Sequence, residues 1–241
     1  MPISFRRSVS AGSGLLIPVI LLCLAGLTAP QAFAQDTPSP ASVAFMKQLD
    51  RIDFAVSAEG NISDTVSGVE NRDATTTHSV LTIHPSTSVG ELVTIRYTVK
   101  PYLGFEYNFG NARYTENTKF VPTPSANLLL GGVQTGVREL TLGYVAHLPY
   151  RPFGITPVLG VGGGTIHFTP TPGGGQGLPN QYRAVYYYNA GLEDNFPGSH
   201  FGMRIGFRQL IYLAPDFLEN YLTITRRLRT SEPTVGFFVR F

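Results

Sequence analysis

The side chains able to do acid–base or nucleophilic chemistry are few and scattered along the chain. The histidines are His78, His84, His147, His167 and His200. His78 and His84 lie near Ser79 and Ser86, but no recognisable nucleophile–base motif surrounds any histidine. The histidines also lack helical spacing, and the single cysteine, Cys23, lies in an N-terminal segment that we predict below to be removed, so no cysteine is left to join them as a metal ligand. We therefore predict no catalysis, no cofactor and no metal site.

Two glycine runs invite comparison with phosphate-binding loops. They occupy residues 160–164 (GVGGG) and 173–175 (GGG). Neither run precedes the Lys-Ser/Thr pair of a P-loop, and no helical pattern follows them. The net charge of +2 is also too small to indicate electrostatic binding of nucleic acid. Nucleotides and nucleic acids are therefore not predicted as partners.

The first 34 residues have the pattern of a secretory signal peptide. Arg6 and Arg7 precede an apolar run at 14–27, and a small-x-small cleavage site follows at 32–34. The apolar run is shorter than the roughly 20 residues of a membrane-spanning helix, so an uncleaved anchor is the less favoured alternative. We predict export, cleavage, and an N-terminal periplasmic linker over residues 35–50.

Beyond the linker, the chain falls into segments in which apolar and polar side chains alternate. In residues 101–110, for example, Phe105 and Tyr107 share one face and Glu106 and Asn108 share the other. Such alternation predicts strands that separate two environments. The segments are 53–60, 91–99, 101–110, 138–148, 155–168, 181–194, 200–212 and 234–241. The glycine-rich fifth segment is the least regular, and we expect a β-bulge near 162–164.

The predicted connections alternate between short and long. Tight turns are expected around 100–102, 149–152 and 196–199. Long loops are expected at 61–90, 111–136, 169–180 and 214–233. Short turns at one end and long loops at the other are typical of outer-membrane barrels with an even number of strands.

The size of the alternating residues indicates which face points outward. An eight-stranded barrel has an interior just wide enough for side chains to fill it, so Phe, Tyr and Leu from every strand would overpack the lumen. We therefore predict that the aromatic face meets lipid, whereas a soluble ligand-binding barrel would have the opposite sidedness. Tyr102, Tyr150, Tyr186 and Tyr212 are expected at the membrane interfaces.

Charges of both signs share the predicted inward face. Asp53 lies on it, together with the candidate lumen network of Glu59, Arg96, Glu106, Glu139, Arg183, Glu193, Arg204, Arg208 and Arg240. Charges confined in a narrow lumen must pair, because an unpaired buried ion costs several kcal/mol. We predict a salt-bridged, closed lumen. The alternative is a soluble sandwich on which these residues are ordinary surface charges.

One basic cluster lies in the last predicted loop. Arg226, Arg227 and Arg229 occur within the segment TRRLRT at 225–230. If this loop is extracellular, the guanidinium groups could form charge-assisted hydrogen bonds to lipopolysaccharide phosphates. A solvated loop without a ligand is the alternative.

Together, the signal peptide, the alternating segments and the runs YLGFEYNFG, LGVGGGTIHF, APDF and TVGFFVRF resemble the outer-membrane β-barrel domain family, the small eight-stranded barrels of the OmpA type. The resemblance implies an all-β, antiparallel, up-and-down transmembrane barrel over residues 51–241 in the bacterial outer membrane, with short periplasmic turns and long extracellular loops. It also implies contact with outer-membrane lipids and lipopolysaccharide, a monomeric state, and a barrel-assembly machinery that reads the terminal Phe241.

The predicted function follows from this architecture. We expect a non-enzymatic integral outer-membrane protein with a role in envelope structure or surface interaction. Two alternatives stay open: a soluble or membrane barrel that binds a lipid or another hydrophobic ligand, and a narrow pore.

Overall fold

The computed structural model describes residues 40–69, 80–121, 128–219, 222 and 224–241. The predicted signal peptide, residues 1–34, lies outside the described residues. The helix α2 (Pro40–Leu49) occupies most of the segment predicted as a linker. No helix among the described residues is long and apolar enough to cross a membrane. Residues 44–241 form one compact unit.

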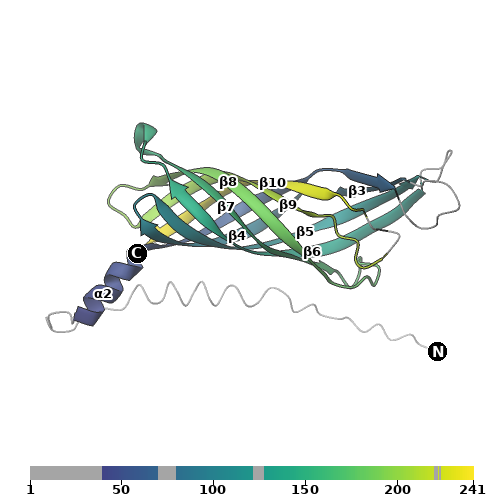
Figure 1. Ribbon diagram of the computed structural model, residues 1–241, viewed down its shortest axis with the longest axis horizontal. Helices are drawn as coiled ribbons and strands as arrows, with labels where there is room; N and C mark the ends of the chain where they lie inside the picture. The colour runs from purple at the N-terminus through teal and green to yellow at the C-terminus, as the bar shows by residue number, and fades with distance from the viewer. Residues whose placement is uncertain (1–39, 70–79, 122–127, 220–221, 223) are drawn as a thin grey trace, which may run out of the picture. The chain divides into compact units, whose positions relative to one another are not determined.

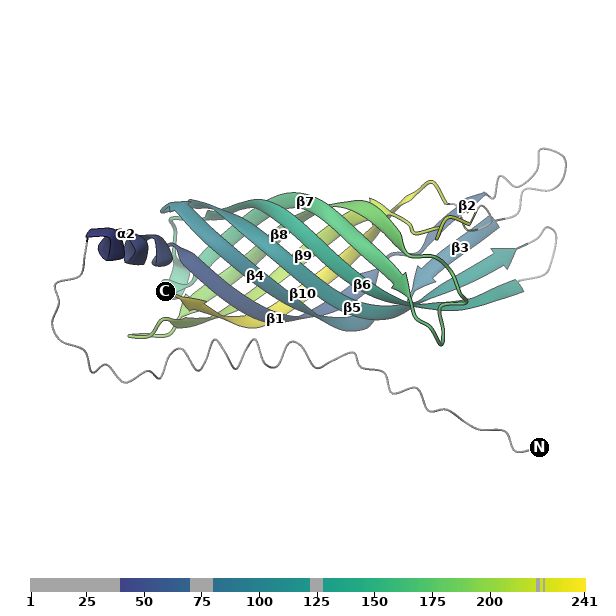
Figure 2. The same ribbon diagram turned by 90° about the horizontal axis from the view of Figure 1, so that it is seen from below.

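Eight long strands make up the wall of a closed barrel (Figures 1 and 2). They are β1 (Ile52–Ser63), β4 (Ser88–Lys100), β5 (Leu103–Val121), β6 (Leu128–His147), β7 (Thr156–Pro170), β8 (Gln181–Asn195), β9 (Phe201–Leu213) and β10 (Arg227–Arg240). Each strand is antiparallel to its neighbours, and pairing of β10 with β1 closes the ring. The predicted eight-stranded antiparallel up-and-down barrel is confirmed.

The two ends of the barrel differ. At the turn end, where β1 begins and β10 finishes, the connections are 101–102, 148–155 and 196–200. The second of these contains the 3-10 helix η1 (Pro152–Gly154). At the overhang end, β5 and β6 project beyond the other strands, and the hairpin of β2 (Val66–Val69) and β3 (Val80–Pro85) extends the sheet along β5.

The predicted loop at 111–136 is wrong for most of its length. β5 and β6 stay paired from Leu103↔Ala146 to Phe120↔Leu128, which leaves 122–127 as the connection. The predicted loop at 61–90 likewise contains β2 and β3. In this part of β5 the pattern is inverted, because Tyr114 points inward and Arg113 points outward. The apolar outer face that predicts a membrane strand is therefore missing from this part of β5.

The expected bulge at 162–164 is also wrong. β7 pairs with β6 and β8 without a register shift, and the shifts occur instead at Thr98/Lys100 and Thr118/Lys119. The glycines serve close approach. A Cβ atom at Gly164 would lie 2.0 Å from the Leu140 carbonyl oxygen, and one at Gly162 would lie 2.5 Å from a ring carbon of Tyr187. Gly162 therefore leaves room for the Tyr187 ring in the narrow lumen, and Gly164 allows β7 to approach the backbone of β6.

Candidate functional site

The barrel exterior carries a belt of apolar side chains on all eight strands. The exposed fractions are 41% for Phe105, 59% for Tyr186 and 62% for Phe237, against 8% for Arg204 and 2% for Glu193. The predicted sidedness is therefore confirmed. The belt includes Phe54, Val56, Ile95, Leu103, Phe105, Tyr107, Leu140, Leu142, Tyr144, Leu159, Val161, Tyr186, Tyr188, Leu192, Phe201, Met203, Ile205, Phe207, Val235 and Phe237.

The belt ends in polar residues toward the overhang end. Glu91, Asn111 and Arg138 occupy one outward row across β4, β5 and β6. The amide of Asn111 donates a hydrogen bond to Glu91 Oε1 at 3.1 Å. On β7 and β8 the row continues with His167 and Tyr182, whose rings stack 4.0 Å apart. The outer surface of the barrel therefore changes from apolar to polar at the height of this row.

Three of the four predicted interface tyrosines are exposed on the outside: Tyr102, Tyr150 and Tyr186. The prediction for Tyr212 is wrong. Tyr212 is buried, and its hydroxyl lies 2.9 Å from Thr230 Oγ1 inside the barrel. Tyr212 has the same place in the alternation of β9 as Arg204 and Arg208. Its position in the strand, and not its aromatic character, therefore decides that it lies inside the barrel.

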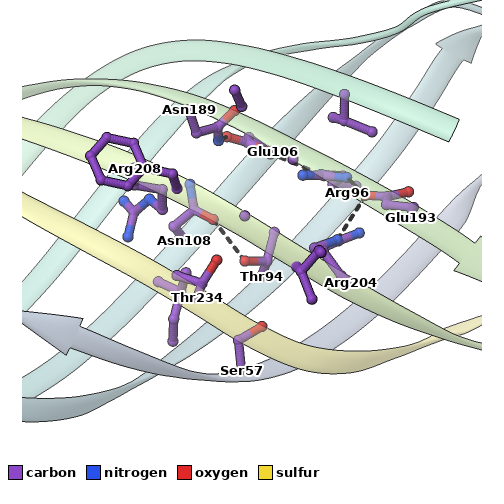
Figure 3. Close-up of a pocket in the computed structure, with 17 residues that line it drawn as sticks. Ser57, Thr94, Arg96, Glu106, Asn108, Asn189, Glu193, Arg204, Arg208 and Thr234 are labelled. Carbon is purple, nitrogen blue, oxygen red and sulfur yellow. Dashed lines mark hydrogen bonds and ion pairs between the residues drawn. The ribbon is translucent and has the colours of Figure 1, made fainter. Parts of the chain in front are cut away.

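Two groups of charged residues fill the lumen. The turn-end cluster consists of Asp53, Arg96, Glu106, Glu193, Arg204 and Arg240. Arg96 lies between Glu106 and Glu193, as Figure 3 shows, with its Nε 3.0 Å from Glu106 Oε2. Arg204 places Nε 2.7 Å from Glu193 Oε1 and Nη2 3.0 Å from Asp53 Oδ1. Three guanidinium groups thus face three carboxylates.

The second group, the Arg208 cluster, consists of Glu59, Glu139, Arg208 and Glu232. Arg208 Nη2 lies 2.5 Å from Glu139 Oε1, and its Nη1 lies 3.0 Å from Glu232 Oε2 and 3.7 Å from Glu59 Oε2. All four side chains are buried. A single cation therefore holds three carboxyl groups together in a place that water does not reach freely.

Tyr187 connects the two clusters. The Arg208 guanidinium carbon lies 5.1 Å from the centre of its ring. Its hydroxyl donates to Glu106 Oε1 at 2.8 Å, and Asn189 donates to the same oxygen at 2.7 Å. The interior is thus one continuous polar network across the barrel.

The structure brings eight of the nine candidate network residues into these clusters. Arg183 is the one that it does not, because its Nη2 pairs with Asp216 Oδ1 at 2.8 Å near the overhang end. Glu232 is not among the candidates, because it falls in the loop predicted at 214–233. The signal was present: Glu232 continues the inward alternation of Thr234 and Gly236.

Little empty space is left between the charged side chains. One cavity of about 30 Å³ lies among Arg96, Glu106 and Arg208, and another of about 20 Å³ lies beside Glu232. Each is of the size that holds one or two water molecules. A wider cavity of about 190 Å³ at the turn end is lined by His147, Arg151 and Arg240.

An apolar cap fills the interior at the overhang end. It consists of Val66, Leu81, Ile83, Tyr114, Val133, Val137, Ile166, Phe168, Val185, Tyr187, Leu210, Tyr212, Ala214, Phe217, Leu222, Ile224 and Leu228. Phe217 comes from the connection between β9 and β10, and its backbone N–H donates to Gln181 Oε1 at 2.9 Å. The carboxyl group of Glu116 is buried near Tyr114 and Tyr212 of this cap.

The described histidines make dispersed contacts. His84 Nδ1 lies 2.7 Å from Thr65 Oγ1, His200 Nδ1 lies 2.9 Å from the Arg240 carbonyl oxygen, and His147 Nε2 lies 3.8 Å from Glu193 Oε2. In the described part of the chain, no three His, Cys, Asp or Glu side chains gather in a way that could hold a metal ion. His78 lies outside the described residues.

The residues predicted to meet partners lie at opposite ends. Arg227 and Arg229 are exposed at the start of β10, near the overhang end, and the exposed Arg226 comes just before them. Phe241 is at the turn end, where its backbone N–H donates to the Ile52 carbonyl oxygen at 3.4 Å. All four side chains are accessible.

Comparison with known proteins finds likeness in three dimensions and not in sequence. No family model and no curated protein matches the chain. Neisserial surface protein A aligns with a TM-score of 0.47 and 11% identity over 78% of this chain and 97% of that chain. The outer membrane protein OprG of Pseudomonas aeruginosa gives 0.47 and 13% over 78% and 95%. Ail, the attachment invasion locus protein of Yersinia pestis, gives 0.39 and 14% over 78% and 98%. These TM-scores are below 0.5, so the fold described above rests on this chain's own strand pairing.

Proposed function

We propose that the protein is an integral outer-membrane barrel with a closed, salt-bridged lumen and a structural or surface-interaction role. The observation that carries the proposal is the apolar belt on all eight strands. Soluble monomers rarely expose a continuous apolar patch of more than a few hundred Å². A belt that surrounds a closed sheet is instead the surface that a bilayer requires. Barrels of this kind place both termini on the periplasmic side, so the turn end is periplasmic and the overhang end extracellular.

The belt makes a sharp test possible with two exposed leucines. Leu142 lies in the belt on β6, whereas Leu218 lies in the connection between β9 and β10. Leu142→Arg is expected to lower the free energy of unfolding in phospholipid vesicles by about 2–4 kcal/mol, because the guanidinium group would enter hydrocarbon. The measurement is urea unfolding in vesicles. Leu218→Arg, the matched control, should change the free energy by less than about 0.5 kcal/mol.

A soluble barrel would give the opposite result. If the belt faced water, arginine at Leu142 would be harmless, and the two variants would unfold alike. Failure of the protein to sediment with vesicles would point the same way. Either outcome would favour the alternative of a soluble ligand-binding barrel.

The closed lumen predicts an absence of conductance. Ion pairs cross the interior at two levels, and the cavities between them hold only one or two water molecules. In planar bilayers the folded protein is expected to give no single-channel steps under an applied voltage. Reproducible steps that depend on the folded protein would instead establish the narrow pore.

The proposal extends to the partners at each end. Arg226, Arg227 and Arg229 are the side chains that we assign to lipopolysaccharide phosphates, which guanidinium groups bind through paired hydrogen bonds. Phe241, exposed at the turn end, is the residue that we assign to recognition by the barrel-assembly machinery. The protein acts as a monomer in this proposal.

A further inference from the structure

The helix α2 carries apolar side chains that nothing in the described structure covers. Phe45 is 63% exposed and Met46 is 58% exposed. Residues 45, 46 and 49 lie on one side of a helix with 3.6 residues per turn, so the half-buried Leu49 belongs to the same face. Lys47 projects on the opposite side. In the part of α2 from residue 45 to 49 the large apolar side chains therefore share one open face, whereas the exposed Val43 lies nearer the side of Lys47.

The last turn of α2 is attached to the margin of the apolar belt. The hydroxyl of Tyr97 donates a hydrogen bond to Gln48 Oε1 at 2.7 Å. Tyr97 lies on the outer face of β4, directly opposite Phe105 of β5 in the ladder. Only Asp50 and Arg51 separate the helix from β1, and the Arg51 carbonyl oxygen accepts a hydrogen bond from the Thr98 N–H at 2.8 Å. The last turn of α2 therefore lies beside the turn-end edge of the belt.

The described part of the barrel offers no apolar place for this face, because the wider cavity at the turn end is lined by charged and polar side chains such as His147, Arg151 and Arg240. Its interior at the turn end is occupied by the buried ions Asp53, Glu193 and Arg204, and an apolar face would leave these charges without partners. The apolar environment that remains beside the helix is the medium that surrounds the belt. A short helix with one apolar face and a lysine on the other is suited to lie in the plane of a bilayer interface.

We propose that α2 is an interfacial membrane helix, with Phe45, Met46 and Leu49 inserted into the periplasmic leaflet and Lys47 directed toward the headgroups. The occupant of the apolar face is phospholipid. This inference rests on the proposed function, since it requires the belt to lie in a bilayer. The helix would hold β1 at the leaflet surface, next to the seam where β1 and β10 close the barrel.

The chain contains no tryptophan, so a single introduced tryptophan reports its own surroundings without background. Three variants suffice: Phe45→Trp on the apolar face of α2, Lys47→Trp on its polar face, and Phe105→Trp in the belt. Each is folded into phosphatidylcholine vesicles with plain or brominated acyl chains. Heat-modifiable gel migration verifies that each variant has formed the barrel.

We expect Phe45→Trp and Phe105→Trp to behave alike. The emission of Phe45→Trp should be blue-shifted and should lose intensity with brominated lipid, as that of Phe105→Trp does. Lys47→Trp should emit as in water and keep its intensity. Such a result would place the apolar face of α2 among the acyl chains.

Two outcomes would overturn the inference while leaving the membrane barrel intact. One is quenching of Phe105→Trp with a water-like, unquenched Phe45→Trp. The other is a blue-shifted Phe45→Trp that brominated lipid does not quench, which would mean that protein, such as a second copy of the chain, covers the face. An unquenched Phe105→Trp in a folded barrel would instead contradict the proposed function itself.

Discussion

Replacing Arg208 by methionine is expected to lower the free energy of unfolding by about 3–5 kcal/mol, or to prevent the barrel from closing. The substitution keeps much of the side-chain volume and removes the single cation from among Glu59, Glu139 and Glu232. Removal of one partner from a buried ion pair leaves an uncompensated charge, which costs an amount of this order. Here three carboxyl groups lose their common partner, so the effect belongs at the upper end. Urea unfolding in detergent micelles or vesicles measures it.

The matched control is Arg138→Met on the exterior of β6. Arg138 is exposed, and its replacement should change the free energy of unfolding by less than about 0.5 kcal/mol. Within the Arg208→Met background, Glu139→Gln and Glu232→Gln should each restore part of the loss, because each removes one of the buried carboxyl groups that have lost their cation. Equal unfolding midpoints for Arg208→Met and Arg138→Met would contradict the role of Arg208 as the cation that compensates the buried carboxyl groups.

The sequence predicts the side of each residue in the belt region, because there the outer face is apolar and the lumen is polar throughout. Phe105 outside and Glu106 inside are examples. The alternation does not give the height of a residue along the barrel axis, because that height depends on the register between neighbouring strands. Arg183 has inward parity, yet its register opposite Ile166 places it near the overhang end with Asp216 rather than with the lumen acids.

The errors cluster where the exterior solvent changes. Beyond Asn111, the outside of β5 is polar and the inside belongs to the apolar cap, so the same alternation has the opposite meaning. A pattern of apolar residues on the outer face therefore predicts a loop where β5 and β6 in fact continue. A local pattern of alternation does not say which solvent surrounds the barrel at a given height along its axis.

The remaining omission is the first part of β10, residues 227–233, which includes Pro233. Proline lacks a backbone N–H and normally indicates a strand edge or an interruption. Here it points outward within β10, where the pairing with β1 passes from Glu59↔Thr234 to Ile62↔Ser231 without a bridge at the proline. The strand continues because β9 still pairs with Pro233 through Phe207. A strand held on its other side can tolerate this gap, and Glu232 thereby reaches Arg208.

The second large effect concerns the acid inside the apolar cap. Glu116 is only 1% exposed, and within the described part of the chain no guanidinium or ammonium group pairs with it. It lies in the part of β5 beyond Phe109, above the belt. Burial in apolar surroundings disfavours the charged form and raises the pKa of the Glu116 carboxyl from 4.5 to about 8, with a smaller contribution from Asp216.

This shift makes stability depend on pH in a definite direction. Between pH 4.5 and 8, the folded state keeps the proton on Glu116 and the unfolded state releases it. The unfolded state then binds fewer protons, so the free energy of unfolding falls as the pH rises through this window and levels off above it. A window of 8 − 4.5 = 3.5 pH units corresponds to about 5 kcal/mol at roughly 1.4 kcal/mol per unit.

Glu116→Gln is expected to abolish this dependence, because glutamine has the same shape and no titrating proton. The variant should match the parent near pH 4 and exceed its free energy of unfolding by up to about 5 kcal/mol at pH 9. Urea unfolding at both pH values measures the difference. Glu91→Gln, which removes an exposed carboxylate from the outward row of β4, is the control and should follow the parent at both. If the curves of Glu116→Gln and the parent ran parallel from pH 4 to 9, Glu116 would have to be charged in the fold. A water-filled or cation-filled cap would then replace the dry one, and the overhang end would be open to solvent rather than closed by its own side chains.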